Sequence, residues 1–362
     1  MKLAKELTVP QALANFQDDD IYSEFSQIRI KHPHHEAAVE VFEKLRKRKI
    51  AAPRAEQTAA SLFAGSRSGK TTTVKWYIEK VVGVAWLDSR FRNAKNREEL
   101  REVEAIKKNC SAADIAELQT FALFVELSGA TTVSGLISDF LEALGDPDPY
   151  GGTTKQRRFR VERYLKERGY QIIFLDETQH IKVQTFSGPV SRQEDATEVQ
   201  NTLKRWLKRW PIVFVGTQHA ENVVFEHQVY TRSVSPIKFG PLHFANDNDK
   251  IIFNDFCGRL AHKLVQHGIL PSPPKILVSG DVPLCLNIAS KGRLGLVTVI
   301  VRMAIENMLN EEKITLELGH LSMAVENFSV RIGICKSNPF TAKEIVIPSL
   351  EEYERDDVEI DI

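Results

Sequence analysis

The sequence of 362 residues predicts an α/β fold in which a doubly wound parallel sheet is followed by a smaller, helical lid domain. Two observations support this. Short apolar runs with the length of buried strands alternate with amphipathic helical segments up to about residue 247. Beyond that point the strands stop, and helical periodicity dominates at 249–268, 281–290, 294–309 and 318–328.

Composition sets limits on the function. Hydrophobic residues make up 43% of the chain, enough to bury an α/β core and a second domain. Lys and Arg together number 48, as do Asp and Glu, so any contact with nucleic acid must come from a local basic patch. The four cysteines have neither CxxC spacing nor His neighbours at metal spacing, which argues against zinc and disulfides. No stretch approaches the roughly 20 apolar residues of a membrane span, and we expect a cytoplasmic protein that does not contact a membrane.

The order of segments along the chain gives the predicted domains. Five apolar runs are predicted as strands, at 60–64, 121–127, 172–175, 212–215 and 237–240. A charged stretch at about 88–117 is interpreted as a helical insertion. We therefore expect an N-terminal arm at 1–25, an α/β core at 26–247, the helical lid at 248–330, and a C-terminal extension at 331–362. The extension ends in an acidic tail, with seven acidic residues and one Arg from residue 351 onward.

A glycine-rich loop joins the first predicted strand to the following helix. The run Ala64-Gly-Ser-Arg-Ser-Gly-Lys-Thr71 matches the P-loop, with alanine in place of the first glycine. In such a loop, backbone N–H groups surround the phosphates, Lys70 reaches the β- and γ-phosphates, and the Thr71 hydroxyl ligates Mg²⁺. The loop therefore predicts ATP and Mg²⁺ as ligands. The predicted nucleotide-binding residues are Ala64, Gly65, Ser66, Arg67, Ser68, Gly69, Lys70, Thr71 and Thr72.

Two carboxylates follow the strand at 172–175. Asp176 is expected to hold Mg²⁺ together with Thr71, and Glu177 to polarise the attacking water. The alternative is that two acidic residues only begin a turn. Thr217 follows the next buried strand, where it would orient the water or touch the γ-phosphate, although a threonine there is equally suited to cap a helix.

Two arginines complete the predicted catalytic set. Arg232 precedes the strand predicted at 237–240 and would act as an arginine finger in the site of a neighbouring subunit. Arg293, in Lys-Gly-Arg-Leu-Gly, begins a lid helix and would reach the γ-phosphate of its own subunit. A surface ion pair is the alternative for either residue.

A P-loop, an Asp-Glu pair, a polar strand tip and two arginines, in this order, resemble the AAA+ ATPases. Within them, the DETQH segment from Asp176, the GTQHAE segment from Gly216 and the lid segment from Ser290 to Val325 resemble the TniB/TnsC family. This resemblance runs from Ile21 to Phe328. It implies an ATPase that assembles as a homo-oligomeric ring or filament on duplex DNA and regulates transposon target selection. A DDE transposase and a TniQ-like adaptor are the implied partners.

Three features depart from the family pattern: the long insertion, Ala64, and the serine after Arg232. DNA contacts are expected to be to phosphates and independent of sequence. The candidates are Thr131, Thr132, Lys155, Arg157 and Arg158, each of which has a solvated helix face as its alternative.

Parts of the same pattern also occur in two other classes of protein. A helicase of the DExH type would need a second motor domain with its arginine motif, and no such segment follows. A signalling or defence NTPase switch would use the same core, but usually carries additional domains. The sequence therefore favours a regulator of transposition, and the signalling or defence switch remains the alternative hypothesis.

Overall fold

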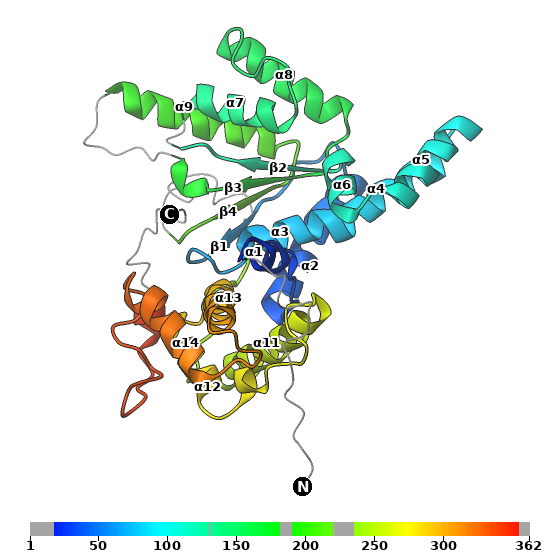
Figure 1. Ribbon diagram of the computed structural model, residues 1–362. Coiled ribbons are helices and arrows are strands. Elements are labelled where there is room, and N and C mark those ends of the chain that lie inside the picture. Colours follow the sequence, from blue (N-terminus) through cyan, green and yellow to red (C-terminus); the bar gives the residue numbers. More distant parts are fainter. Residues whose placement is uncertain (1–17, 130–131, 182–189, 219, 221–234, 355–362) are drawn as a thin grey trace. The chain divides into compact units, whose positions relative to one another are not determined.

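The computed structural model describes residues 18–129, 132–181, 190–218, 220 and 235–354 (Figure 1). Side chains are described for these residues except 18–20 and 190–197. By its contacts the chain divides into two compact units, each described by itself. Unit 1 comprises Met1–Pro33, Gly65–Gly69 and Gly240–Ile362, and unit 2 comprises His34–Ala64 and Lys70–Phe239.

A five-stranded sheet forms the centre of unit 2. Its strands are β1 (Ala60–Phe63), β2 (Ala122–Glu126), β3 (Ile172–Asp176), β4 (Ile212–Gly216) and β5 (Ser235–Pro236). They lie in the order β2-β3-β4-β1-β5, and every pair is parallel (Figure 1). Parallel strands need crossovers that cover the sheet, which explains why these strands are apolar along their whole length.

Helices cover both faces of this sheet (Figure 1). One face carries α2 (Pro33–Ala51), α3 (Lys70–Tyr77) and η1 (Ile78–Val82), and the other carries α7 (Val133–Ala143), α8 (Thr154–Glu167) and α9 (Val190–Leu207). Helix α4 (Gly83–Asn93) follows η1, and its Trp86 and Leu87 form a separate small cluster with Val103. Side chains of β3 alternate between the two cores, as the period of a strand requires: Phe174 packs edge-on against Phe42 and Tyr77, whereas Leu175 lies in the core that contains Trp206. The predicted α/β fold with a doubly wound parallel sheet is thereby confirmed.

The stretch predicted as a helical insertion contains helices in the structure, whereas one predicted strand is displaced. The charged insertion folds as α5 (Arg97–Asn109) and α6 (Ala112–Leu118), and the only buried residue of these two helices is Val103. The strand predicted at 237–240 is displaced, because β5 pairs with β1 at Ser235 and Pro236, and only the Ile237 N–H adds a further bond, to the Ser61 carbonyl at 2.8 Å. Proline has no N–H to donate, which restricts it to an edge strand such as this one.

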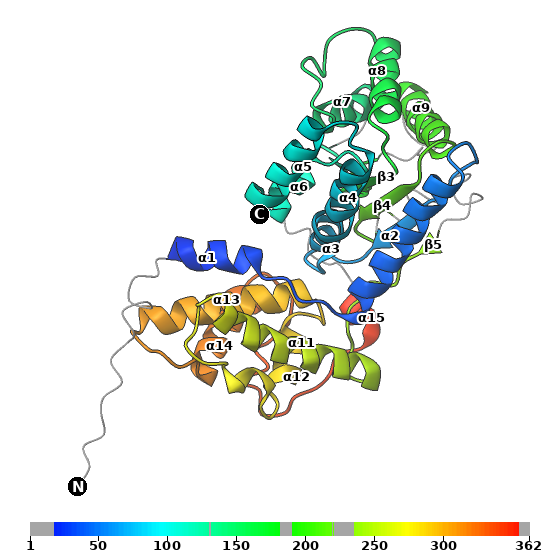
Figure 2. The same ribbon diagram turned by 90° about the vertical axis from the view of Figure 1, so that its right-hand side faces the viewer.

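Unit 1 is helical. Its elements are α1 (Asp18–Gln27), α11 (Asp247–Gln266), η3 (Lys275–Val278), α12 (Val282–Ala289), α13 (Leu294–Asn310), α14 (Leu318–Val325), η4 (Glu326–Val330) and α15 (Leu350–Glu354). They enclose one apolar core, to which α13 contributes Leu296, Val297 and Ile300 (Figure 2). Among the described residues no single helix is long and apolar enough to span a membrane, and α12 with α13 reaches that threshold only as a pair bent by 112°.

Both ends of the described chain pack into unit 1. Ile21 of α1 is buried and Phe25 packs against the core, so the segment predicted as an N-terminal arm contributes to the packing of unit 1 from Ile21 onward. Tyr353 lies at the start of the segment expected to be an acidic tail. It is buried, and its hydroxyl donates to Asn287 Oδ1 at 2.8 Å. Residues 355–362 lie outside the described residues.

Candidate nucleotide-binding site

The P-loop adopts a conformation that depends on its glycines. Gly69 has a φ of +97°, a value that L side chains rarely adopt, and Arg67 has a φ of +59°. The Ser68 N–H and hydroxyl both donate to the Gly65 carbonyl, at 3.3 and 2.8 Å. These bonds close a tight turn directly before α3, so the loop leads into a helix N-terminus, where anions are favoured.

Lys70 and Thr71 occupy the first turn of α3. The Lys70 amine is buried and donates to the Ala64 carbonyl at 2.8 Å. The Thr71 hydroxyl donates to Asp176 Oδ2 at 2.6 Å, although the two residues are 105 positions apart. Two parts of the sequence that were predicted to share a metal are therefore in direct contact.

The residues present fit Mg²⁺. A hydroxyl and a carboxylate are hard oxygen ligands, and Mg²⁺ typically takes one or two carboxylates and completes its shell with phosphate oxygens and water. No group of three or more His, Cys, Asp or Glu side chains suited to a metal occurs among the residues that the structure describes.

Glu177 follows Asp176 in a left-handed backbone conformation, with φ +57° and ψ +38°. Its backbone N–H donates to Asp176 Oδ1 at 2.9 Å. The Glu177 carboxylate accepts a hydrogen bond from the side-chain amide of Gln179. A non-glycine residue held at positive φ is uncommon and is characteristic of functional sites.

The ends of β3 and β4 are connected by side chains to which the sequence analysis assigned no individual role. The Thr178 hydroxyl donates to the Val215 carbonyl at 2.8 Å, and Gln179 Oε1 accepts from the Thr217 N–H at 3.2 Å. A Cβ on Gly216 would lie 2.6 Å from the Thr178 hydroxyl, so this position requires glycine. The DETQH and GTQHAE segments, which carry the family resemblance, are therefore in contact in the structure. The only signal for this in the sequence was their position after neighbouring strands.

Arg293 lies in unit 1, directly before α13, and is 7% exposed. Its guanidinium contacts the P-loop closely enough that a Cβ on Gly65 would lie 2.7 Å from Cζ. Two residues further along, a Cβ on Gly295 would lie 2.1 Å from the carbonyl oxygen of Arg67. The structure therefore brings the predicted lid arginine against the loop expected to bind phosphate, and both glycines are needed for this approach.

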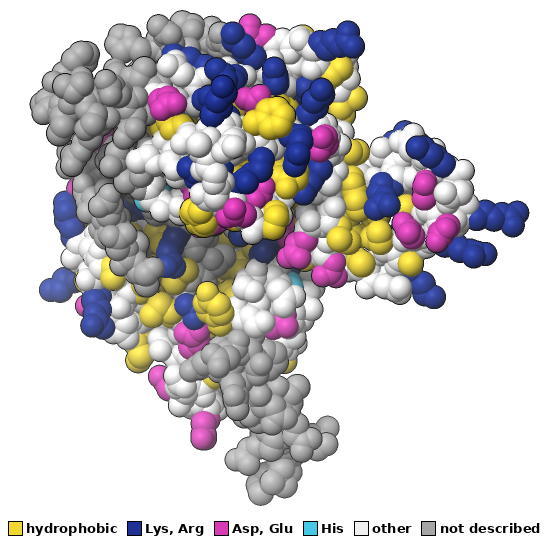
Figure 3. All heavy atoms as spheres, turned by 90° about the horizontal axis from the view of Figure 1, so that it is seen from above, with side chains coloured by type: hydrophobic (Ala, Val, Ile, Leu, Met, Phe, Trp, Pro, Cys, Tyr) yellow, Lys and Arg dark blue, Asp and Glu magenta, His cyan; other side chains and the backbone are white. Residues whose placement is uncertain are grey.

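The other predicted site residues are placed as follows. Arg232 and Thr131 lie outside the described residues. Thr132 caps α7 by accepting from the Gly135 N–H at 3.1 Å. Lys155 is exposed at the start of α8, and Arg158 is half-buried there. Figure 3 shows Lys and Arg side chains gathered over the face of the molecule that carries α8.

Arg157 requires a correction. It is only 7% exposed, and its guanidinium donates to Ser138 at 2.8 Å and to Ser134 at 2.6 Å, which fastens α8 to α7. A buried side chain that donates to two serines of α7 is not free to reach a phosphate. Helical periodicity in the sequence could not reveal this, because the serines lie on a different helix.

Comparisons with known proteins agree with this fold. Residues 54–224 match the model of an AAA domain. No curated protein matches the sequence. Among solved structures, the ORC2 protein of Aeropyrum pernix in its ADPNP-ADP complexes has a TM-score of 0.51 and 15% identity, covering 84% of this chain and 71% of that one. The ADP form of the same protein has a TM-score of 0.54 and 14% identity, with 84% and 72% covered. Residues 54–224 thus resemble an AAA domain, and the chain shares the fold of these ORC2 structures.

Proposed function

We propose that this protein is an ATP-dependent AAA+ ATPase that assembles on duplex DNA and regulates transposon target selection by recruiting and activating a DDE transposase. The observation that carries the enzymatic part is the 2.6 Å hydrogen bond between Thr71 and Asp176 beside a buried Lys70. The nucleotides in the Aeropyrum pernix ORC2 structures, ADPNP and ADP, support an adenine nucleotide as the ligand.

Each site residue has a proposed role in hydrolysis. Lys70 would leave the Ala64 carbonyl and bind the β- and γ-phosphates, while Thr71 and Asp176 would hold Mg²⁺. Mg²⁺ would neutralise charge on the phosphates. Glu177 would orient the water, Thr217 would position it or contact the γ-phosphate, and Arg293 would stabilise charge on that phosphate. Arg232 is proposed as the finger that a neighbouring subunit receives.

The proposed DNA binding and role in transposition rest on the resemblance of the DETQH segment from Asp176 and the GTQHAE segment from Gly216 to the TniB/TnsC family. These two segments lie side by side in the structure, since Gln179 Oε1 accepts from the Thr217 N–H. A homo-oligomeric ring or filament in the cytoplasm, with a TniQ-like adaptor as a further partner, completes the proposal. Phosphate contacts from Lys155 and Arg158 would make DNA binding independent of sequence.

Fluorescence anisotropy of a labelled duplex tests this proposal, with ATP, with ADP and without nucleotide, at several salt concentrations. We expect ATP to strengthen binding, with affinity that falls steeply as salt rises. Negative-stain imaging with a slowly hydrolysed ATP analogue should then show rings or filaments on DNA. Absence of any ATP-stimulated DNA binding at low salt would refute the proposal and favour the signalling or defence switch.

A double substitution, Lys155→Ala with Arg158→Ala, locates the contacts on α8. We expect weaker DNA binding and unchanged ATP affinity of the isolated subunit. The matched control is Lys107→Ala with Lys108→Ala on α5, because both lysines are exposed and the change in charge is the same. Equal DNA affinity of the two variants would place the DNA contacts elsewhere.

A further inference from the structure

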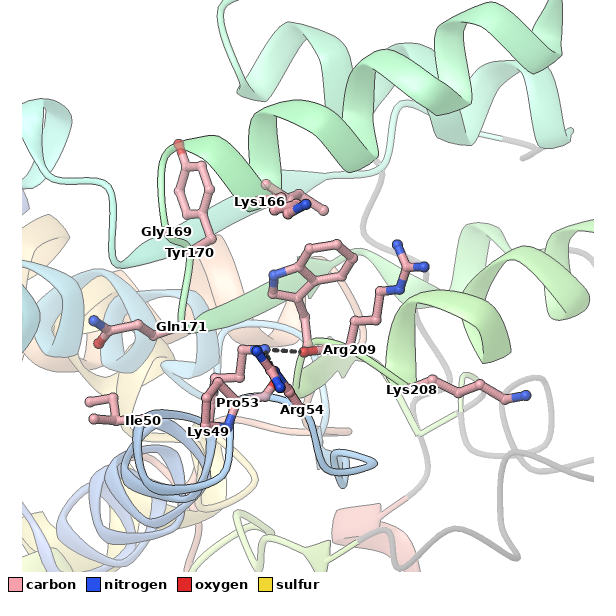
Figure 4. A pocket seen from close by; sticks show the side chains of 12 residues that line it. Lys49, Ile50, Pro53, Arg54, Lys166, Gly169, Tyr170, Gln171, Lys208 and Arg209 are labelled. Atoms are coloured by element: carbon pink, nitrogen blue, oxygen red, sulfur yellow. Dashed lines mark hydrogen bonds between the residues drawn. The ribbon is translucent and has the colours of Figure 1, made fainter.

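Unit 2 contains a concave site at the end of the sheet opposite to Asp176. The pocket has a volume of about 650 Å³ and lies where β3 and β4 begin, whereas Asp176 lies where β3 ends (Figure 4). Its lining comes from the end of α2 and the residues after it, the end of α8, and the segment that follows α9. The lining residues are Lys49, Ile50, Pro53, Arg54, Leu165, Lys166, Gly169, Tyr170, Gln171, Lys208, Arg209 and Trp210.

The lining carries a strong positive charge. Five of its residues are Lys or Arg and none is Asp or Glu, in a chain whose formal net charge is zero. One counter-charge lies outside the lining, because Glu162 pairs with Arg209 at 3.3 Å. Within the described part of the chain, Arg54, Lys166 and Lys208 form no ion pair. The pocket therefore concentrates positive charge without an internal partner for most of it.

Lys49 is fixed inside this cluster. Its amine donates to the Pro53 carbonyl at 2.9 Å and to the Arg209 carbonyl at 2.6 Å, as the dashed line to Arg209 in Figure 4 illustrates. Burial, together with the positive charge of Arg209, lowers the pKa of Lys49 below its ordinary value. A bound anion would relieve this repulsion, which is the electrostatic signature of a site that favours anions.

The aromatic residues define how a ligand would be recognised. Trp210 is 4% exposed and Tyr170 is 6% exposed, so their faces pack in the core and offer no platform on which a base could stack. Recognition must then come from the charges. Five cations from three segments suit an anion that repeats along a chain better than a single carboxylate, and a nucleic-acid backbone carries one phosphate for each nucleotide.

We propose that this pocket is a second, nucleotide-independent contact for the phosphate backbone of duplex DNA. The inference rests on the proposed DNA-binding function but not on the P-loop, because no residue of the lining belongs to the nucleotide site. Contacts at both edges of the sheet would let one protomer hold DNA before and after hydrolysis. An acidic peptide is the competing ligand that the experiment must distinguish.

The test is DNA binding by the full chain without nucleotide, measured by anisotropy of a labelled duplex across a salt series. The variant is Lys166→Ala with Lys208→Ala, since both side chains are exposed and form no described ion pair. Lys49 is left intact because it holds two backbone carbonyls. The control of equal charge change is Lys107→Ala with Lys108→Ala. Each variant is also measured in a Lys70→Ala background.

We expect the pocket variant to flatten the log-log salt dependence by about two units for each engaged protomer, roughly one for each lost phosphate contact, and the control to leave it unchanged. The effect should persist in the Lys70→Ala background. Equal slopes for pocket and control variants, no DNA binding without nucleotide, or displacement of DNA by polyglutamate at equal charge concentration would each overturn the inference. Loss of ATP stimulation with the pocket effect intact would instead count against the proposed function alone.

Discussion

The side-chain amide of Gln179 donates to the Glu177 carboxylate, while its Oε1 accepts from the Thr217 N–H at 3.2 Å. One glutamine thus links the proposed catalytic base at the end of β3 to the tip of β4. The carboxylate oxygen that binds the amide is one that Glu177 would need in order to polarise water. Gln179 is therefore placed to restrain the base, and β4 can affect that restraint through Thr217.

Replacing Gln179 with alanine should raise basal ATP turnover. Releasing one hydrogen bond of about 1 kcal/mol corresponds to roughly fivefold in rate. We expect kcat to rise with KM unchanged, because the substitution does not touch the P-loop. His180→Ala is the control, since its side chain is exposed on the same short helix. A kcat equal to or below that of the wild type would show that Gln179 supports the base instead of restraining it.

Replacing Glu177 with glutamine should stop turnover but preserve ATP binding. An amide cannot accept the proton of the attacking water, whereas Asp176 and Thr71 remain available to the metal. We expect phosphate release to fall by about 10²- to 10⁴-fold, the usual contribution of a general base. Phosphate release at the wild-type rate would remove Glu177 from the mechanism.

Replacing Lys70 with alanine should abolish ATP binding. The buried amine beside Ala64 is the cation expected to meet the β- and γ-phosphates. Isothermal titration calorimetry gives the affinity directly, with Lys80→Ala as the control because that lysine is exposed on η1. Unchanged ATP affinity in the Lys70 variant would contradict the assignment of the P-loop.

Replacing Gly295 with alanine should destabilise unit 1. The new Cβ would lie 2.1 Å from the Arg67 carbonyl oxygen, so α13 or the P-loop must shift, at a cost of about 1–3 kcal/mol. Gly258→Ala is the matched control within α11, where the Cβ would meet Val278 at an ordinary 3.7 Å. Helix propensity should make that control more stable by up to about 1 kcal/mol. Chemical denaturation compares the two, and equal stability would argue against the close approach at Gly295.

Glu43 gives a prediction for the pH dependence of stability. Its carboxylate accepts from Arg46 and from the Tyr77 hydroxyl at 2.8 Å. Burial alone would raise the pKa of Glu43, but hydrogen bonds from Arg46 and Tyr77 outweigh it and hold the pKa below the ordinary 4.5. A depressed pKa means that ionised Glu43 stabilises the folded state above about pH 4.5, and that this contribution disappears as the pH falls through the folded-state pKa.

The substitution Glu43→Gln should therefore lower the free energy of unfolding at pH 7 by about 1–3 kcal/mol, the cost of leaving Arg46 without its charged partner. The difference from wild type should shrink as the pH is lowered below about 4.5. Urea denaturation at several pH values measures it, with Glu40→Gln as the control because Glu40 is exposed on the same helix. A difference that stays constant with pH would exclude the carboxylate charge as its source.

The sequence by itself determined those features whose cause is local. Buried parallel strands are apolar along their length, so β1 to β4 could be located by composition, and Gly169, with a φ of +75°, could be placed after α8 as a helix cap. The P-loop is one continuous segment whose backbone requires glycine at Gly69. The Asp176 and Glu177 pair is identified by the strand that precedes it.

Only the tertiary structure decided the features that depend on contacts between distant segments. The sequence predicts an exposed Arg157 that could bind DNA, but in the structure this side chain is buried and donates to two serines of α7. Gln179 lies in the DETQH segment, but its contact with the Thr217 N–H could not be predicted, because it depends on β3 and β4 ending side by side. The basic pocket around Lys49 draws on three segments up to 160 residues apart. The periodicity of a sequence indicates which face of a helix or strand is buried, but not which other helix or strand packs against that face. The contacts named above depend on which elements pack together, so the sequence could not predict them.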